Sequence, residues 1–117
     1  MKSLIQIKRV YDAPLKKDGF RILVDRLWPR GVSKEIAALD EWAKDVAPSP
    51  ALRKWYDHDP KRWTDFKRKY RLELEKNEAA KSFIESHNNK KLITLVYGAK
   101  DEAHSHALVL QQFLQEQ

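Results

Sequence analysis

Three short hydrophobic runs stand out along the chain, and each has the pattern of a β-strand. Residues 4–10 alternate apolar and polar side chains, which is typical of a strand with one face in water. Residues 20–27 are apolar at more consecutive positions, which favours an interior strand covered on both sides. Residues 92–97 are rich in β-branched side chains and end at Gly98. We therefore expect a sheet of about three strands.

Helix-capping residues punctuate most of the remaining chain. Ser33, Ser49, Asp59 and Asp101 each stand where a side-chain oxygen can accept a hydrogen bond from the first turn of a helix. Proline follows two of these caps directly, at the first helical position that it favours. These signals predict helices over residues 33–46, a short helix from residue 50, and helices over 60–76, 78–87 and 102–115.

A strand, a long helical crossover and a further strand favour parallel pairing of the second and third strands, with a right-handed connection. The first connection, DAPLKKDG, is too short for a helical crossover, so the orientation of the first strand stays open. A chain of 117 residues forms one core of this kind. We predict a single α/β domain over residues 1–117, with a small, mainly parallel sheet and helices packed around it.

Composition narrows the classes of function. The chain has no cysteine, which excludes disulfides and thiolate catalysis. Its first ten residues have too short an apolar run for a signal peptide or a membrane span, so we expect a cytoplasmic protein with no membrane partner. The formal net charge of +6 favours anionic partners, although solubility alone could explain it. No motif calls for a cofactor or a metal ion.

The second predicted strand ends in the segment DRLWPRG, which has the side chains of an anion-binding site. Arg26 and Arg30 offer planar guanidinium groups that suit phosphate or carboxylate, and Pro29 stiffens the turn between them. Trp28 could stack on a base or a sugar ring, and its alternative role is ordinary packing. Ligands tend to bind at the carboxyl ends of strands in open α/β sheets, so this segment is a candidate wall of a pocket.

The third predicted strand ends in YGAKDEAHSH, a second candidate wall. Gly98 permits a close approach of the backbone, and Lys100 adds a positive charge. Asp101 and Glu102 are ordinary residues of a helix start. His106 falls on the apolar stripe of the following helix and so points inward, either toward the site or as a core histidine bonded to the backbone. His104 lies on another face, which makes a zinc site weak.

Four segments together resemble a known family. They are RILVDRLWPRG, WAKDVAPSPALRKW, YDHDPKRWTDFKRKYRLEL and ITLVYGAKDEAHSHALVLQQFL, and they cover almost the whole chain. The chain resembles the YeaO-like branch of the domain-of-unknown-function family 488, which has no established activity. The resemblance implies cysteine in longer relatives where Tyr97 stands, and a Cys-His-Arg group at the positions of Ser105, His106 and Ala107. Only the histidine is retained here. The resemblance supports Asp25 and a nearby arginine as site residues.

The segment around His58 offers a further site residue and an alternative function. His58 precedes an Asp-Pro helix start, and the His-Asp-Pro element is a recurring feature of the resembled branch. The helix 60–76 carries Lys61, Arg62, Lys67, Arg68, Lys69 and Arg71, which suggests a nucleic-acid-binding face. Its aromatic residues fall on the predicted buried stripe, however, where they are poorly placed to stack on bases. A solvated basic face is therefore the preferred interpretation.

Our first hypothesis is a pocket for an anionic metabolite, such as a nucleotide or a phosphorylated sugar. In it Arg26 and Arg30 hold the anion, with Trp28, His58, Lys100 and Ser105 as further ligand-binding residues. If the protein is a hydrolase or a transferase, His106 acts as general acid or base, Asp25 orients an arginine or a histidine, and Tyr97 donates a hydrogen bond. The alternatives are a nucleic-acid-binding or regulatory module that uses the helix 60–76, and a non-catalytic scaffold whose arginines bridge strand ends to helices.

Overall fold

All four strands of the protein run parallel in one sheet. A computed structural model describes residues 1–117 and gives the strand order β1-β4-β2-β3. The last strand of the sequence therefore lies in the middle of the sheet, between the first and the second. The strands are β1 (Leu4–Arg9), β2 (Phe20–Leu23), β3 (Glu41–Trp42) and β4 (Leu92–Tyr97).

Five α-helices and four short 3-10 helices complete the domain. The α-helices are α1 (Lys34–Ala37), α2 (Pro50–Tyr56), α3 (Trp63–Lys76), α4 (Glu78–His87) and α5 (His106–Gln115). The 3-10 helices are η1 (Lys16–Asp18), η2 (Lys44–Val46), η3 (Pro60–Arg62) and η4 (Glu102–His104). None of the helices combines the length and the apolar composition that a membrane crossing requires.

The pairing of the strands confirms one prediction and settles an open question. β2 pairs with β4 in parallel, as the long crossover predicts. β1 also pairs with β4 in parallel, from Leu4 opposite Leu92 to Arg9 opposite Tyr97. The short connection from β1 therefore carries the chain back along the sheet through η1 rather than through an α-helix. The α/β fold is confirmed, with four strands where three are predicted.

The predicted helix over residues 33–46 is wrong. Ser33 does cap a helix through the Ile36 amide, but α1 ends after one turn because Ala38 takes a left-handed conformation with φ of 48°. The guanidinium group of Arg21 binds the carbonyl oxygens of Ala37 and Ala38, which a longer helix needs for its own hydrogen bonds. The chain then pairs with β2 as the fourth strand, β3.

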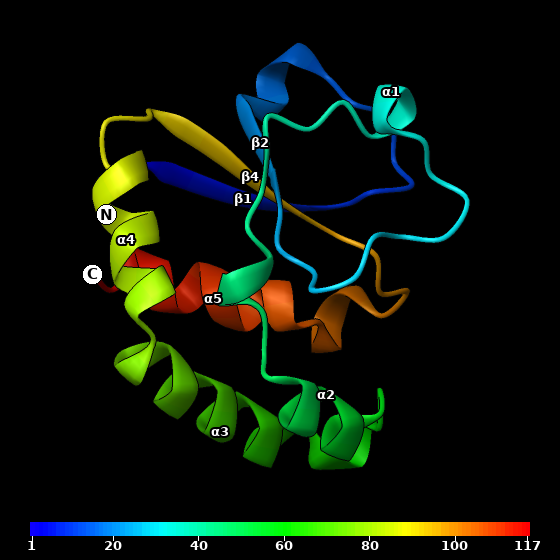
Figure 1. Ribbon diagram of the computed structural model, residues 1–117, viewed down its shortest axis with the longest axis vertical. Helices are drawn as coiled ribbons and strands as arrows, with labels where there is room; N and C mark the ends of the chain where they lie inside the picture. The colour runs from blue at the N-terminus through cyan, green and yellow to red at the C-terminus, as the bar shows by residue number, and fades with distance from the viewer.

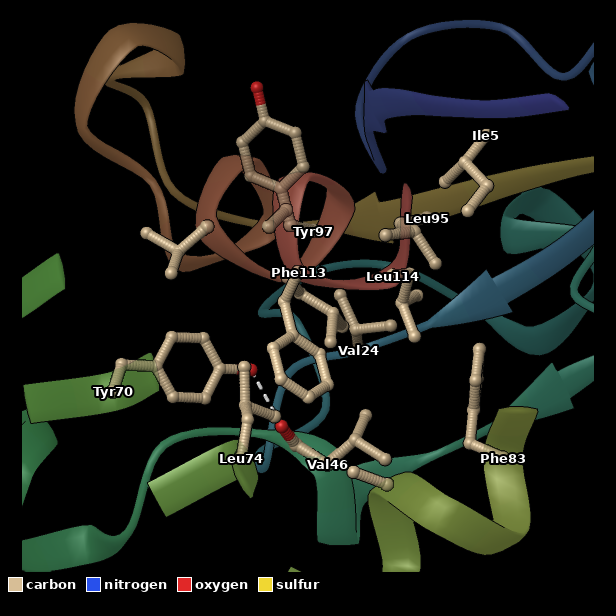
Figure 2. Close-up of a cluster of buried hydrophobic side chains, with 14 of the residues drawn as sticks. Ile5, Val24, Val46, Tyr70, Leu74, Phe83, Leu95, Tyr97, Phe113 and Leu114 are labelled. Atoms are coloured by element: carbon tan, nitrogen blue, oxygen red, sulfur yellow. Dashed lines mark hydrogen bonds between the residues drawn. The ribbon is translucent and has the colours of Figure 1, made fainter. Parts of the chain in front are cut away.

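One face of the sheet carries the larger core. Figure 1 shows α5 next to the sheet, with α3 and α2 outside it and α4 beside them. Ile93, Leu95 and Tyr97 alternate along β4 toward this face, and Phe113 and Leu114 of α5 pack with them. In Figure 2 the Tyr70 hydroxyl donates a hydrogen bond of 2.6 Å to the Val46 carbonyl. This bond attaches α3 to the segment that follows β3.

The opposite face of the sheet is covered by a smaller cluster. Val10, Leu23 and Val96 pack there with Val32 and Ala37, which come from α1 and the segment before it. Consecutive residues of β2 and β4 thus pack on opposite faces. The prediction that the second strand is covered on both sides is confirmed. The two covered faces leave the ends of the strands as the open part of the fold.

Candidate functional site

A pocket of about 400 Å³ lies at the carboxyl ends of the strands. Each strand contributes through the segment that follows it, and α2, α3, α5 and the turn after α2 supply the remaining wall. The position agrees with the rule for open α/β sheets. The lining residues are Tyr11, Asp25, Arg26, Leu27, Trp28, Pro29, Arg30, Ala47, Pro48, Arg53, His58, Phe66, Gly98, Ala99 and His106.

Asp25 joins the ends of β2 and β4 at the bottom of this pocket. Its Oδ2 accepts a hydrogen bond of 2.9 Å from the Gly98 amide, and its Oδ1 lies 3.2 Å from Nε2 of His106. A Cβ atom on residue 98 would lie 3.0 Å from Oδ2, so glycine permits this close approach. The two predicted walls of the site therefore meet through the side chain of Asp25.

His106 begins α5 and is fixed by the end of β2. Its Nε2 lies 3.0 Å from the Val24 carbonyl oxygen, which can only accept, so Nε2 carries a proton. Its side chain is 17% exposed and lines the pocket. One ring nitrogen thus has the backbone partner expected of a core histidine, although the residue lies at the predicted site.

Three guanidinium groups surround the pocket. Arg26 donates from Nε to the Pro48 carbonyl at 3.3 Å and from Nη2 to the Ala47 carbonyl at 3.2 Å. The guanidinium groups of Arg30 and Arg53 make no hydrogen bond or ion pair within the chain, and both residues are exposed. Asp25 is the one carboxylate among the lining residues. The pocket therefore has an excess of positive charge.

The turn that carries Arg26 and Arg30 is held by aromatic side chains. The indole of Trp28 donates to the Val32 carbonyl at 2.6 Å and packs edge-on against Trp42, with ring centroids 5.4 Å apart. The indole of Trp42 donates to the Asp25 carbonyl at 2.7 Å. Trp28 lines the pocket with part of its ring, so packing and ligand contact are compatible roles.

Three of the predicted site residues lie outside the pocket lining. Lys100 is exposed, and Ser105 is buried with no hydrogen-bond partner for its hydroxyl. Tyr97 is also buried, and Figure 2 shows its hydroxyl pointing away from Tyr70 and Phe113. Burial, and then the negative charge of Glu102, raise the pKa of Tyr97. The structure brings together the other six, which are Asp25, Arg26, Trp28, Arg30, His58 and His106.

Sequence reasoning missed Arg53 as a residue of the pocket. Arg53 lies on α2, which the sequence predicts as a short helix without any site residue. The one available signal is its place in the SPALRKW segment of the family resemblance.

The predicted basic helix presents its aromatic residues inward. Phe66 and Tyr70 are buried, Trp63 is half-buried, and Phe66 stacks on Tyr56 with ring centroids 4.1 Å apart. The helix 60–76 therefore offers charge but few free ring faces to a nucleic acid.

Nδ1 of His104 lies 2.7 Å from the carboxylate of Asp101. No group of three or more potential metal-ligating side chains is present.

Comparison with known proteins agrees with the resemblance. Residues 4–117 match the family model DUF488-N3i, whose description is "Inactive DUF488-N3 subclade". The chain belongs to the DUF488 family. Two DUF488 relatives are the uncharacterized protein YeaO of Escherichia coli strain K12, 44% identical, and the uncharacterized protein Rv3073c of Mycobacterium tuberculosis strain H37Rv, 40% identical. These matches cover 94% and 97% of this chain and 96% and 95% of the respective relatives. No solved structure gives a significant match.

Proposed function

We propose that this DUF488 protein binds a small phosphorylated metabolite in the pocket at the carboxyl edge of its sheet. One observation carries the proposal: Arg26, Arg30 and Arg53 line the same pocket, and two of these guanidinium groups have no partner in the chain. Guanidinium forks match phosphate oxygens in geometry and charge. The single carboxylate of the lining, Asp25, already faces the Gly98 amide and His106. The excess positive charge is thus available to a ligand.

We propose further that the bound ligand is not chemically converted. The lining contains no serine, threonine, cysteine or lysine, and its one carboxylate, Asp25, accepts a hydrogen bond from the Gly98 amide. Nε2 of His106 is already bonded to the Val24 carbonyl. The description of the matching subclade as inactive points the same way. Hydrolase or transferase activity with His106, Asp25 and Tyr97 stays a sequence-based prediction, and product formation from the bound ligand would contradict this part of the proposal.

The scaffold alternative accounts for only one of the arginines. Arg26 bridges the end of β2 to residues 47 and 48, as a structural arginine would. Arg30 and Arg53 bridge nothing, so a scaffold gives no reason for either to stand at the pocket. An exposed arginine changes the stability of the folded protein little. Substitution of these arginines therefore has to separate ligand binding from a structural role.

The first test measures binding of adenosine 5′-monophosphate by isothermal titration calorimetry. We expect Arg53→Ala to weaken binding by about tenfold or more, because it removes a charge-assisted hydrogen bond. Arg68→Ala is the matched control, since Arg68 carries the same charge on α3 and lies outside the pocket. Equal binding by both variants and the unchanged protein would overturn the proposal. Weaker binding of uncharged adenosine than of the phosphate is also expected.

The nucleic-acid alternative is tested with the same proteins and a single-stranded oligonucleotide. Polyanion binding through the helix 60–76 weakens steeply with salt, and the variant Lys67→Ala/Arg68→Ala/Lys69→Ala removes it. Binding in the pocket changes less with salt and survives in that triple variant. If the oligonucleotide is the one ligand that binds and the triple variant loses it, the pocket proposal fails.

A further inference from the structure

Two consecutive non-glycine residues next to the pocket adopt left-handed backbone conformations. Asp57 has φ of 47° and His58 has φ of 53°. Such conformations cost L-residues free energy that glycine does not lose, although Asp and His tolerate them better than most. Asp57 closes α2, since its amide donates to the Arg53 carbonyl at 3.0 Å. The strain at Asp57 therefore has a structural reason within the helix.

The left-handed backbone of His58 belongs to a turn over residues 56–59, in which the Asp59 amide donates to the Tyr56 carbonyl at 3.0 Å, but its side chain has no partner in the chain. Neither ring nitrogen of His58 makes a hydrogen bond or an ion pair, and the residue is exposed. The ring of Tyr56 lies 6.4 Å from the imidazole ring in a tilted arrangement. The side chain nevertheless lines the pocket. A side chain whose hydrogen-bonding atoms are all free at a pocket is available to a ligand.

His58 lies next to an aromatic residue. Tyr56, its neighbour, stacks on Phe66 with ring centroids 4.1 Å apart, and Phe66 also lines the pocket. The lining includes further apolar residues, namely Leu27, Trp28, Pro29, Pro48 and Ala99. The pocket is thus lined by apolar and aromatic side chains as well as by guanidinium groups.

The size of the pocket points to a ligand larger than one anion. A volume of about 400 Å³ holds roughly a dozen water molecules at about 30 Å³ each. A phosphate group has only five heavy atoms, so it leaves most of this space empty. The apolar lining favours a flat or partly apolar group in the remainder.

We infer that the ligand carries a polar ring beside its phosphate, and that the imidazole of His58 hydrogen-bonds to this ring. The ligand class is then a phosphate ester of a sugar or of a nucleoside, with the phosphate at Arg26, Arg30 and Arg53. This inference rests on the proposed function, because it assigns a role to a further residue of the same pocket. The two free nitrogens of the imidazole can serve as one donor and one acceptor toward the ring.

The experiment compares two glycine substitutions that relieve the same kind of strain. His58→Gly removes the imidazole, and Asp57→Gly leaves it in place. Because glycine adopts positive φ freely, each variant should raise the thermal midpoint of the free protein by about 2–4 °C. Adenosine 5′-monophosphate, ribose 5-phosphate and inorganic phosphate serve as probes in titration calorimetry.

We expect His58→Gly to weaken binding of adenosine 5′-monophosphate or ribose 5-phosphate by about fivefold, the loss of one hydrogen bond. Its affinity for inorganic phosphate should stay within about twofold of the unchanged protein. Asp57→Gly should bind all three probes within about twofold. If His58→Gly fails to fold, His58→Ala tests the same loss, because alanine has no side-chain hydrogen-bonding atom.

Three results would overturn the inference. The first is ring-probe binding by His58→Gly that equals that of the unchanged protein. The second is an equal loss in Asp57→Gly, which would assign the effect to the shape of the turn. The third is binding of inorganic phosphate as tight as that of both ring probes. If Arg53→Ala also leaves every affinity unchanged, the proposed function itself fails; if Arg53→Ala weakens all probes, only the assignment of His58 does.

Discussion

Asp18 is a buried carboxylate that joins two strands to the first connection. It lies 2.7 Å from Nη1 of Arg21 in β2 and 3.1 Å from Nζ of Lys8 in β1. Its Oδ2 also accepts a hydrogen bond from the Leu15 amide. Burial alone raises the pKa of Asp18, but this hydrogen bond and the two cations outweigh it, so the pKa lies below its usual value. The negative charge at this position therefore stabilises the folded protein.

Replacing Asp18 tests this contribution through the pH dependence of stability. Because its pKa is lower in the folded state, its contribution is present above about pH 4 and is lost as the pH falls through the folded value. We expect Asp18→Asn to lower the free energy of unfolding by about 3 kcal/mol near neutral pH. Urea titrations at several pH values should show that the free energy of unfolding falls less below about pH 4 in Asp18→Asn than in the unchanged protein.

The exposed Asp65 provides the control for that measurement. It lies 3.9 Å from Arg68 and its side chain is 65% exposed, so Asp65→Asn should change stability by less than about 0.5 kcal/mol. An acid profile of Asp18→Asn that matches the unchanged protein would contradict the assigned role.

Six members of the pocket could be predicted: Asp25, Arg26, Trp28, Arg30 and His106 follow strand ends, and His58 belongs to the His-Asp-Pro element of the resembled branch. Arg53 escaped prediction since a helical arginine usually faces water, and nothing local relates it to a distant strand end. Tyr97 was predicted at the site by its position at the strand end. The alternation of β4 instead turns it into the larger core, with 1% of its surface exposed.

At the scale of elements, α3 determines where α2 begins. Ser49 caps α2 by accepting from the Leu52 amide, and Glu73 of α3 accepts from both the amide and the hydroxyl of Ser49, at 2.9 and 2.6 Å. This bidentate contact fixes the helix that carries Arg53. The start of α2 is thus held by a residue 24 positions later in the chain.

We predict that Glu73→Ala lowers the free energy of unfolding by about 1–2 kcal/mol, because the two charge-assisted bonds are lost and the cap of α2 is weakened. The measurement is chemical denaturation monitored by circular dichroism. Glu75→Ala is the control, since Glu75 is exposed on the same helix and makes no hydrogen bond. Equal stability of the two variants would show that the contact with Ser49 contributes little.

β3 illustrates what local sequence cannot reveal about an element. A strand of two residues, Glu41 and Trp42, is too short to have a hydrophobic period. The surrounding segment has helical spacing, yet Arg21 takes the carbonyls of Ala37 and Ala38, and Asp40 accepts from the Arg21 amide. Contacts from β2 therefore override a local preference for helix. The remaining helix starts were predictable because their caps act within one turn, as at Asp59 and Asp101, but the predicted helix 102–115 is divided at Ser105 into η4 and α5.

At the scale of the whole molecule, the two ends of the chain lie together. Figure 1 shows both termini beside α4 and α5, and the Met1 amino group bonds to the Leu114 carbonyl at 3.3 Å and to that of Gln117. The arrangement places no element between the ends. A short linker can therefore join them without disturbing the sheet.

Circular permutation tests this arrangement. New ends between Asn88 and Asn89, exposed residues between α4 and β4, should give a protein that unfolds cooperatively and keeps the helical signal in circular dichroism. New ends between Leu95 and Val96 interrupt the central strand and should abolish cooperative unfolding. A failure of the first permutant to fold would contradict the idea that the ends are free to be joined.

The α/β class and the position of the pocket at the carboxyl edge could be predicted, because they follow from the alternation of strands and helical crossovers. The strand order could not. β2 and β4 have similar apolar density, and only contacts across the completed domain decide that β4 stands between β1 and β2.

The central position of β4 has a consequence for the synthesis of the protein. β1 and β2 each pair with β4, and they have no bond to one another in the sheet. A ribosome makes the chain from the amino end, so both strands emerge long before their common partner exists. Nascent chains shorter than about four fifths of the full length consequently lack the strand that joins β1 to β2. Until Leu92–Tyr97 is released, only helices of the same chain or chaperones can shield their apolar strand residues from water.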